Sequence, residues 1–171
     1  MRYVAVVMIL AAVSYAADRW QELAAKNETT DVPAIVFKLP GESTSSSVAP
    51  WLVIVCSDSK WKATALHTGG VTIDIADKRP AFLKAPQQQV HLDFDSTSES
   101  RFFDIAKTSD VFFLDRHTTE KIVHAGRFRV QFRAARGTEE VFSFSPAETE
   151  TERIREACGM DQPPSAARQH H

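Results

Sequence analysis

The sequence predicts a mainly β fold, either an antiparallel β-sandwich or a partly closed barrel of about eight short strands. Short segments rich in β-branched and aromatic residues recur along the chain, and turn residues separate them at close spacing. Several segments alternate apolar and polar residues with a period of two, as a strand with one buried face does. The longer helix signals occur at two places, just before the last predicted hairpin and at the C-terminal end. This distribution of elements is typical of an all-β domain with appended helices.

The longest apolar run after the N-terminal segment spans residues 50–56. Its length, its β-branched residues and the proline at its start, Pro50, predict a central strand that is covered on both faces. Before it, residues 17–26 are expected to form a short helical turn with Trp20 and Leu23 on one face. The expected strands, in chain order, span residues 34–39, 50–56, 61–67, 71–75, 89–95, 101–105, 111–114, 127–133 and 141–145.

Two helices are expected in the second half of the chain. The first covers residues 118–125, with Thr118 as its N-cap and a glycine directly after it. The second covers residues 146–157, with Ser145 as its N-cap, a proline at its first position and acidic residues in its first turn. The inner face of this second helix would carry Cys158 into the core.

The first sixteen residues are expected to be a signal peptide. Arg2 is the only charged residue before Asp18, residues 4–13 are all apolar, and residues 14–16 have the small-x-small pattern of a cleavage site. A retained membrane anchor is the alternative, but the apolar run is far shorter than the roughly 20 residues that a membrane-spanning helix needs. We therefore expect a periplasmic or secreted protein, with cleavage after Ala16 and no stable membrane span afterwards.

The rest of the chain has the composition of one globular domain, since 43% of the residues are hydrophobic and 25% are charged. Cleavage after residue 16 would leave 171 − 16 = 155 residues. Residues 17–160 are expected to form a single β-rich domain, and residues 161–171 a disordered tail. Loss of Arg2 changes the formal net charge from −2 to −3. No nucleic-acid partner is predicted, because such a partner requires a clustered basic surface.

The chain contains two cysteines, Cys56 and Cys158. An even number of cysteines in an exported domain favours a disulfide bond. The bond would close a loop of about a hundred residues, for which the chain-entropy model gives a stabilisation of roughly 4.7 kcal/mol. Two free buried thiols and a metal or redox pair are the alternatives. Against the last, the cysteines form no CxxC motif and no histidine has a suitable local spacing.

Several landmarks follow one another in a recognisable order. They are the leader, Trp20, the apolar strand ending at Cys56, the alternating segment 90–95, the helix 118–125, the segments 128–132 and 141–144, and a helix ending in Cys158-Gly159. This order resembles the VasI-type periplasmic proteins associated with type VI secretion clusters, and their stand-alone exported relatives, over residues 20–160. The resemblance implies a non-catalytic accessory or binding domain of the cell envelope that acts through a protein partner.

One candidate polar site is formed by His91, Asp93 and Asp95, which are expected to project from the outer face of one strand. Alternate residues on a strand lie about 6.8 Å apart. This spacing is too wide for three residues of one strand to converge on an ion with bonds of about 2.1 Å, so a metal site would need a ligand from a neighbouring strand. A solvent-exposed polar surface is the simpler interpretation.

A second candidate is the stripe formed by Arg127, Arg129 and Arg133 on the outer face of the strand 127–133. A guanidinium group can bind a carboxylate or phosphate through two parallel hydrogen bonds, which suits recognition of an acidic ligand or partner. The alternative is pairing with Asp or Glu on a neighbouring strand, which contributes little to stability at an exposed surface. This stripe is the preferred candidate for a ligand or partner face.

The sequence contains no Gly-x-Ser-x-Gly elbow, no glycine-rich phosphate loop and no HExxH motif. We therefore predict neither a catalytic centre nor a cofactor. The expected function is that of an exported non-catalytic accessory or binding domain of the cell envelope, with type VI secretion as the association that the resemblance implies. Two alternatives remain open: a small secreted inhibitor or a protein that binds acidic ligands or glycans through the arginine stripe, and a hydrolase whose site is assembled across strands.

Overall fold

The structure is a computed structural model that describes residues 19–26, 33–44, 47, 49–75, 85–146 and 148–160. Its strands are β1 (Gln21–Lys26), β2 (Pro33–Pro40), β3 (Glu42–Ser43), β4 (Trp51–Ser57), β5 (Lys60–His67), β6 (Gln87–Phe94), β7 (Thr97–Ile105), β8 (Val111–Leu114), β9 (Phe128–Arg133) and β10 (Glu139–Phe144). The helices of the described part are α1 (Arg116–His124) and α2 (Glu148–Cys158), and neither is long and apolar enough to cross a membrane. The predicted leader (1–16) and the predicted tail (161–171) lie outside the described residues.

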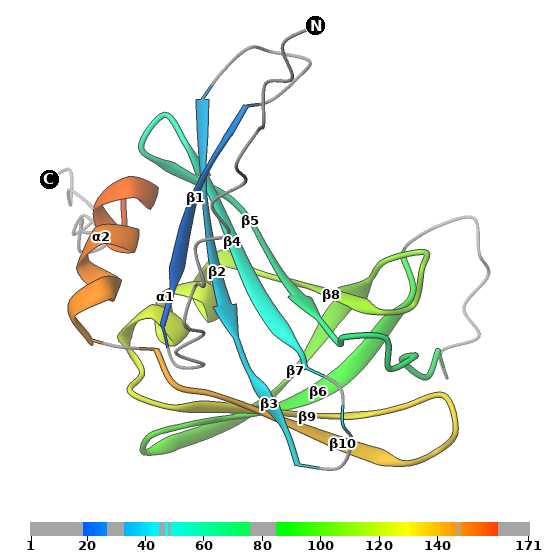
Figure 1. Ribbon diagram of the computed structural model, residues 1–171. Coiled ribbons are helices and arrows are strands. Elements are labelled where there is room, and N and C mark those ends of the chain that lie inside the picture. The colour runs from blue at the N-terminus through cyan, green and yellow to red at the C-terminus, as the bar shows by residue number, and fades with distance from the viewer. Residues whose placement is uncertain are drawn as a thin grey trace, which may run out of the picture.

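The ten strands form one antiparallel sheet in the order β1-β2-β4-β5-β8-β7-β6-β9-β10-β3. The sheet curls into a half-barrel, and both helices lie on the same side of it (Figure 1). The prediction of a mainly β, antiparallel fold is confirmed. The sandwich alternative is wrong, because continuous ladders join β5, β8, β7, β6 and β9, and all ten strands of the described residues belong to one sheet. The sheet has ten strands rather than about eight, since β1 and β3 were not predicted.

A single residue connects a strand near one edge of the sheet to the strand at the other edge. Strand β2 lies next to one edge of the sheet and β3 forms the other edge, yet only Gly41 separates them in the chain. The Gly41 amide donates a hydrogen bond to the carbonyl oxygen of Pro50 (2.9 Å). A Cβ atom at this position would overlap the ring of Phe144. The close approach of backbone and ring therefore requires a glycine, and it brings the half-barrel near to closure.

Aromatic side chains fill the inside of the half-barrel. The rings of Phe128 and Phe144 stack with their centroids 4.7 Å apart, and Phe132 makes edge contacts with Phe112 (5.2 Å) and Phe142 (5.1 Å). All five of these phenylalanines are at most 2% exposed. Offset and edge-to-face pairs of this kind stabilise a core beyond the area they bury. The alternation predicted for the later strands places these rings on the buried face.

Two local predictions about secondary structure are wrong. Residues 21–26 form a strand rather than a helical turn, because every one of them pairs with β2, whereas an isolated helical turn is unfavourable. Trp20 is buried, while Leu23 is 50% exposed, so the two do not share a buried face. Residues 71–75 do not form a strand either. Only Ile73 makes a bridge, to Ala134.

Both predicted helices exist, but their starts differ from the prediction. The N-cap of α1 is Asp115 instead of Thr118: the Asp115 carboxylate accepts a hydrogen bond from the Thr118 amide (2.7 Å), and the Thr118 side chain is buried. An aspartate satisfies the free amides of a first helical turn as well as a threonine does, and here it leaves the threonine free to pack inward. Helix α2 begins at Glu148, two residues later than predicted, and ends at Cys158; it is followed by Gly159, whose φ of 62° favours glycine.

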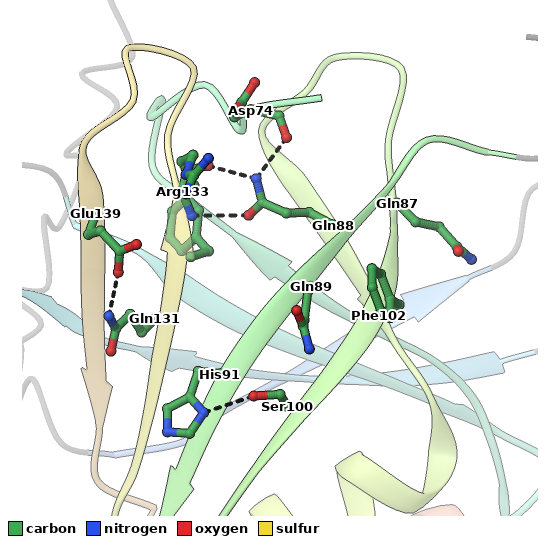
Figure 2. Close-up of a pocket in the computed structure, with 11 residues that line it drawn as sticks. Asp74, Gln87, Gln88, Gln89, His91, Ser100, Phe102, Gln131, Arg133 and Glu139 are labelled. Carbon is green, nitrogen blue, oxygen red and sulfur yellow. Dashed lines mark hydrogen bonds between the residues drawn. The ribbon is translucent and has the colours of Figure 1, made fainter. Parts of the chain in front are cut away.

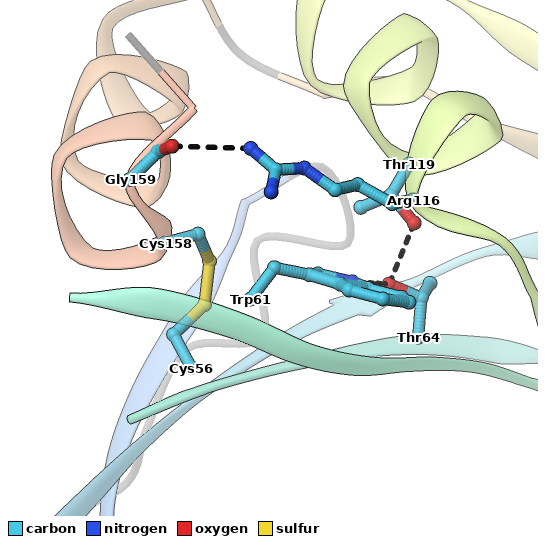
Figure 3. The surroundings of a disulfide bond; sticks show 7 residues. All are labelled: Cys56, Trp61, Thr64, Arg116, Thr119, Cys158 and Gly159. Carbon is cyan, nitrogen blue, oxygen red and sulfur yellow. Dashed lines mark hydrogen bonds between the residues drawn. A yellow bond between two sulfur atoms is a disulfide. The ribbon is translucent and has the colours of Figure 1, made fainter. Parts of the chain in front are cut away.

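The predicted disulfide is present between Cys56 of β4 and Cys158 of α2, with their Cα atoms 5.0 Å apart (Figure 3). It closes a separation of 102 residues. Close to it, a second connection ties the two helices: an Arg116 amino group on α1 donates to the carbonyl oxygen of Gly159 (3.2 Å). Helix α1 is also joined to the sheet by a bond from Thr119 to Thr64 on β5 (2.7 Å).

The expectation that the strand at residues 50–56 is covered on both faces is wrong. Its inward side chains, Leu52, Ile54 and Cys56, are at most 1% exposed, whereas Trp51 and Val53 on the outer face are only half-buried. The reason is that α1 and α2 both contact the sheet from the inner side, where Cys158 meets Cys56 and Thr119 meets Thr64.

Candidate functional site

The structure brings the two predicted polar groups together on the outer face of one pair of strands. Strands β6 and β9 are antiparallel neighbours, and their register places Asp93 directly opposite Arg129. His91 and Asp93 therefore share an outer surface with Arg129, with Arg127 two positions before it and with Arg133 four positions after it. The two candidates of the sequence are parts of one surface, which we call the polar face.

The side chains of His91, Asp93 and Asp95 do not converge on one point. The His91 ring lies 3.2 Å through its Nε2 from an Asp93 carboxylate oxygen, and 3.0 Å through its Nδ1 from the Ser100 hydroxyl. The carboxylate of Asp95 instead accepts hydrogen bonds from the amides of Gly126 (2.7 Å) and Arg127 (2.8 Å), and so fixes the start of β9. Among the residues the structure describes, no group of three His, Cys, Asp or Glu side chains could hold a metal ion.

The three arginines of the stripe are exposed on the polar face. In the described ranges, no carboxylate forms an ion pair with the guanidinium groups of Arg127, Arg129 or Arg133. Asp93 lies opposite Arg129, but its carboxylate contacts His91. The cross-strand pairing that was the alternative interpretation of these arginines is thus not seen within the described residues, and their donors are available to a ligand.

A hollow of about 740 Å³ opens on this face between β6 and β9 (Figure 2). A volume of this size is typical of sites for small ligands. His91 and Arg133 belong to it, so it contains one residue from each predicted candidate. The other residues that line it were not singled out from the sequence: Asp74, Gln87, Gln88, Gln89, Ser100, Phe102, Gln131, Phe132 and Glu139.

The hollow exists because β6 and β9 separate beyond the pair His91–Gln131, where their ladder ends. Two more positions of the ladder would have paired Val90 with Phe132 and then Gln89 with Arg133. Instead, the buried side chain of Gln88 holds the Arg133 backbone: its Oε1 accepts from the amide (3.1 Å), and its Nε2 donates to the carbonyl oxygen (2.8 Å). The same Nε2 also donates to the carbonyl oxygen of Asp74 (2.7 Å). A side chain thus replaces a backbone pair, and the strands can diverge without leaving buried groups unsatisfied.

Two smaller hollows continue along β9 from the first. One, of about 440 Å³, is lined by Asp93, Asp95, Arg127 and Arg129 together with Phe94, Gly126 and Ser145. The other, of about 300 Å³, lies towards β10 and β3 and is lined by Glu42, Arg127, Arg129, Ser143 and Ser145. All three hollows lie on the polar face, and each contains at least one arginine of the stripe.

The groups on this face are chemically suited to binding polar and anionic ligands. It offers guanidinium groups for anions, and amide, hydroxyl and carboxylate groups that can bind hydroxyls or peptide groups. One arrangement resembles catalytic machinery, since Ser100, His91 and Asp93 form a chain of close polar contacts, a hydrogen bond between Ser100 and His91 and an ion-pair contact between His91 and Asp93. The His91 and Asp93 side chains are 41% and 42% exposed, however, whereas catalytic relays depend on a site that excludes water.

No protein-family model, curated protein or solved structure matches this chain. The fold and the site therefore define the class to which it belongs. It is a disulfide-linked domain built on one curled antiparallel sheet, with a polar, arginine-bearing face on the outside of strands β6, β9 and β10.

Proposed function

We propose that this chain is an exported, non-catalytic binding domain of the cell envelope, and that it binds an anionic ligand or partner on the polar face. One observation carries the proposal: Arg127, Arg129 and Arg133 lie exposed over adjoining hollows without an ion pair to any described residue. Guanidinium groups in such positions can bind carboxylates or phosphates through paired hydrogen bonds without first losing an internal partner.

Export and a place in the envelope rest on other observations. The N-terminal sixteen residues have the pattern of a signal peptide, and disulfides persist in oxidising compartments outside the cytosol. The accessory role, and with it an association with type VI secretion, is supported only by the resemblance of the sequence to VasI-type proteins. A type VI secretion cluster should then lie beside the gene for this chain, and a gene neighbourhood without one would remove that part of the proposal.

The binding face is tested by replacing its charges. The triple variant Arg127→Gln, Arg129→Gln, Arg133→Gln should bind an immobilised carboxylate polymer about tenfold or more weakly than the wild type, because charge-assisted hydrogen bonds are lost. The control is Lys60→Gln, Lys62→Gln, Lys107→Gln, which changes the net charge equally at exposed positions outside the hollows. Equal binding by the two triple variants would show that only net charge matters, and would overturn the proposal.

A hydrolase is the second candidate, and the chain formed by Ser100, His91 and Asp93 is the observation that favours it. A serine nucleophile needs a base within hydrogen-bonding distance, and His91 is so placed. If these three residues are catalytic, Ser100→Ala should abolish turnover of ester substrates in a broad hydrolase screen. If the protein only binds its ligand, the screen will detect no turnover that depends on Ser100.

A further inference from the structure

We infer that the hollow between β6 and β9 is a subsite for a pyranose ring, and that the ligand of the polar face is an acidic polysaccharide. The inference rests on the proposed function and names the class of its ligand. Phe102 lies at the β7 side of the hollow, and 57% of its surface is exposed (Figure 2).

Phe102 is an unusual residue for its position. The other outward residues of β7 are polar, namely Ser98, Ser100 and Asp104, as expected for a strand face in water. A phenylalanine that is more than half exposed forgoes most of the stabilisation that its burial would provide. The Phe102 ring lines a polar hollow, and Phe102 lies opposite Gln89 in the ladder between β6 and β7. A flat apolar ring beside hydrogen-bonding groups suits a ligand with one apolar face and polar edges, which is the character of a pyranose.

The polar groups of the hollow suit hydroxyls better than bare anions. The Gln89 amide, which is both a donor and an acceptor, makes no side-chain hydrogen bond with another described residue, and in Figure 2 it lies between Phe102 and β9. Glu139, which accepts a hydrogen bond from Gln131, would repel a plain polyanion but can accept from a hydroxyl. Arg133 can bind a carboxylate in the same hollow. A sugar acid has both kinds of group.

The length of the face indicates a polymer rather than a single sugar. The two smaller hollows carry Arg127 and Arg129, so cationic side chains follow β9 from residue 127 to residue 133. At about 3.4 Å per residue, this stretch is roughly 20 Å long, which exceeds one ring several times over. An extended acidic chain could occupy the hollows in succession, with one ring against Phe102.

The test uses the exported protein with its disulfide intact and three soluble polymers. Polygalacturonate has pyranose rings and carboxylates, poly-L-glutamate has carboxylates alone, and dextran has pyranose rings without charge. The wild type should bind polygalacturonate most tightly. Phe102→Ala should weaken that binding about three- to tenfold, and Phe102→Tyr should restore it. The matched control is Phe113→Ala, which removes another phenylalanine, 48% exposed, on the neighbouring strand β8 outside the hollow.

The outcomes separate this inference from the proposed function. If poly-L-glutamate binds as tightly as polygalacturonate, or if Phe102→Ala and Phe113→Ala behave alike, the ligand is an acidic protein or another polyanion; the sugar subsite is then wrong while the anionic face stands. If dextran binds as well as polygalacturonate, the acidic part of the inference is wrong. If neither polyanion binds, both the inference and the proposed function fail.

Discussion

At the scale of single residues, the fold depends on places where only one kind of side chain fits. Gly41 is the clearest of them, because it connects the two ends of the sheet and faces the Phe144 ring without room for a Cβ atom. Gly159 is another, since a Cβ there would overlap the carbonyl oxygen of Ser59 and its φ of 62° is already in the left-handed region.

Gly41→Ala should therefore destabilise the protein by about 1–3 kcal/mol, the usual cost of forcing an extra methyl group into a filled core. Urea unfolding measures the change. Gly126→Ala is the control, because its Cβ would meet Asp95 only at ordinary contact distance (3.5 Å), and it should cost far less. If the overlap with Phe144 is the cause, adding Phe144→Leu to Gly41→Ala should recover part of the loss. Additive effects of the two substitutions would contradict this explanation.

His67 is the residue at which pH should act on stability. Its ring stacks on Trp51 with the centroids 4.9 Å apart, and Lys38 lies over the same tryptophan. Burial lowers the pKa of His67 below 6.5, and Lys38 lowers it further, while Asp110 acts in the opposite direction. Between the lowered pKa and 6.5, the unfolded chain binds more protons at this site than the folded protein does. Stability should therefore fall as the pH drops below 6.5, and should be unaffected by His67 above it.

Replacement by an aromatic residue that does not titrate isolates this effect. His67→Phe keeps a ring against Trp51, and its Tm relative to that of the wild type should rise progressively between pH 7.5 and pH 5. Thermal unfolding at a series of pH values measures the difference, with His124→Phe, at the exposed end of α1, as the control. A difference in Tm between His67→Phe and wild type that stays constant with pH would contradict the assignment.

At the scale of secondary-structure elements, the divergence of β6 and β9 creates the site. The alternation of apolar and polar residues is enough to predict both strands and their outward residues, including His91, Asp93 and Arg129. Their pairing could not be predicted, because it joins segments almost forty residues apart and depends on the whole sheet. The role of Gln88 could not be predicted either: the alternation places it on the same face as Val90 and Leu92, but no local pattern shows that its amide binds the backbone of Arg133.

Gln88→Leu should cost about 2–4 kcal/mol. The leucine fills a similar volume but leaves the Arg133 amide and the Asp74 carbonyl group without their Gln88 partner, and each buried polar group left in this state costs about 1–3 kcal/mol. The Arg133 carbonyl oxygen also loses Gln88 but still accepts a hydrogen bond from the Asp74 amide (3.0 Å). Gln87→Leu is the matched control, because the Gln87 side chain bonds, among the described residues, only to the exposed side chain of Asp104. Urea denaturation of the two variants provides the measurement. A similar loss in both would mean that Gln88 does not hold the strands in this arrangement.

At the scale of the whole molecule, the sequence was more informative about which residues are buried than about how the sheet is arranged. Cys56 and Cys158, the two cysteines of an otherwise ordinary domain, were sufficient to predict a link between the central strand and the last helix. The order of the ten strands was not predictable, because β8, β7 and β6 are inserted between β5 and β9 only through long-range pairing. Edge strands such as β1 have weak sequence patterns, since they bury little of their surface.

The disulfide holds α2 against the inner side of the sheet, at the end where α1 also contacts it. Cys56→Ala with Cys158→Ala should lower the free energy of unfolding by up to about 4.7 kcal/mol, the chain-entropy value for a loop of this length. Urea unfolding of the oxidised wild type, the reduced wild type and the double variant measures the effect. Reduction should destabilise the wild type and leave the double variant unchanged, which separates the loss of the cross-link from the loss of two buried sulfur atoms. If reduction changes neither protein, α2 is held by its packing and by the bond from Arg116 to Gly159, and the cross-link contributes nothing to stability.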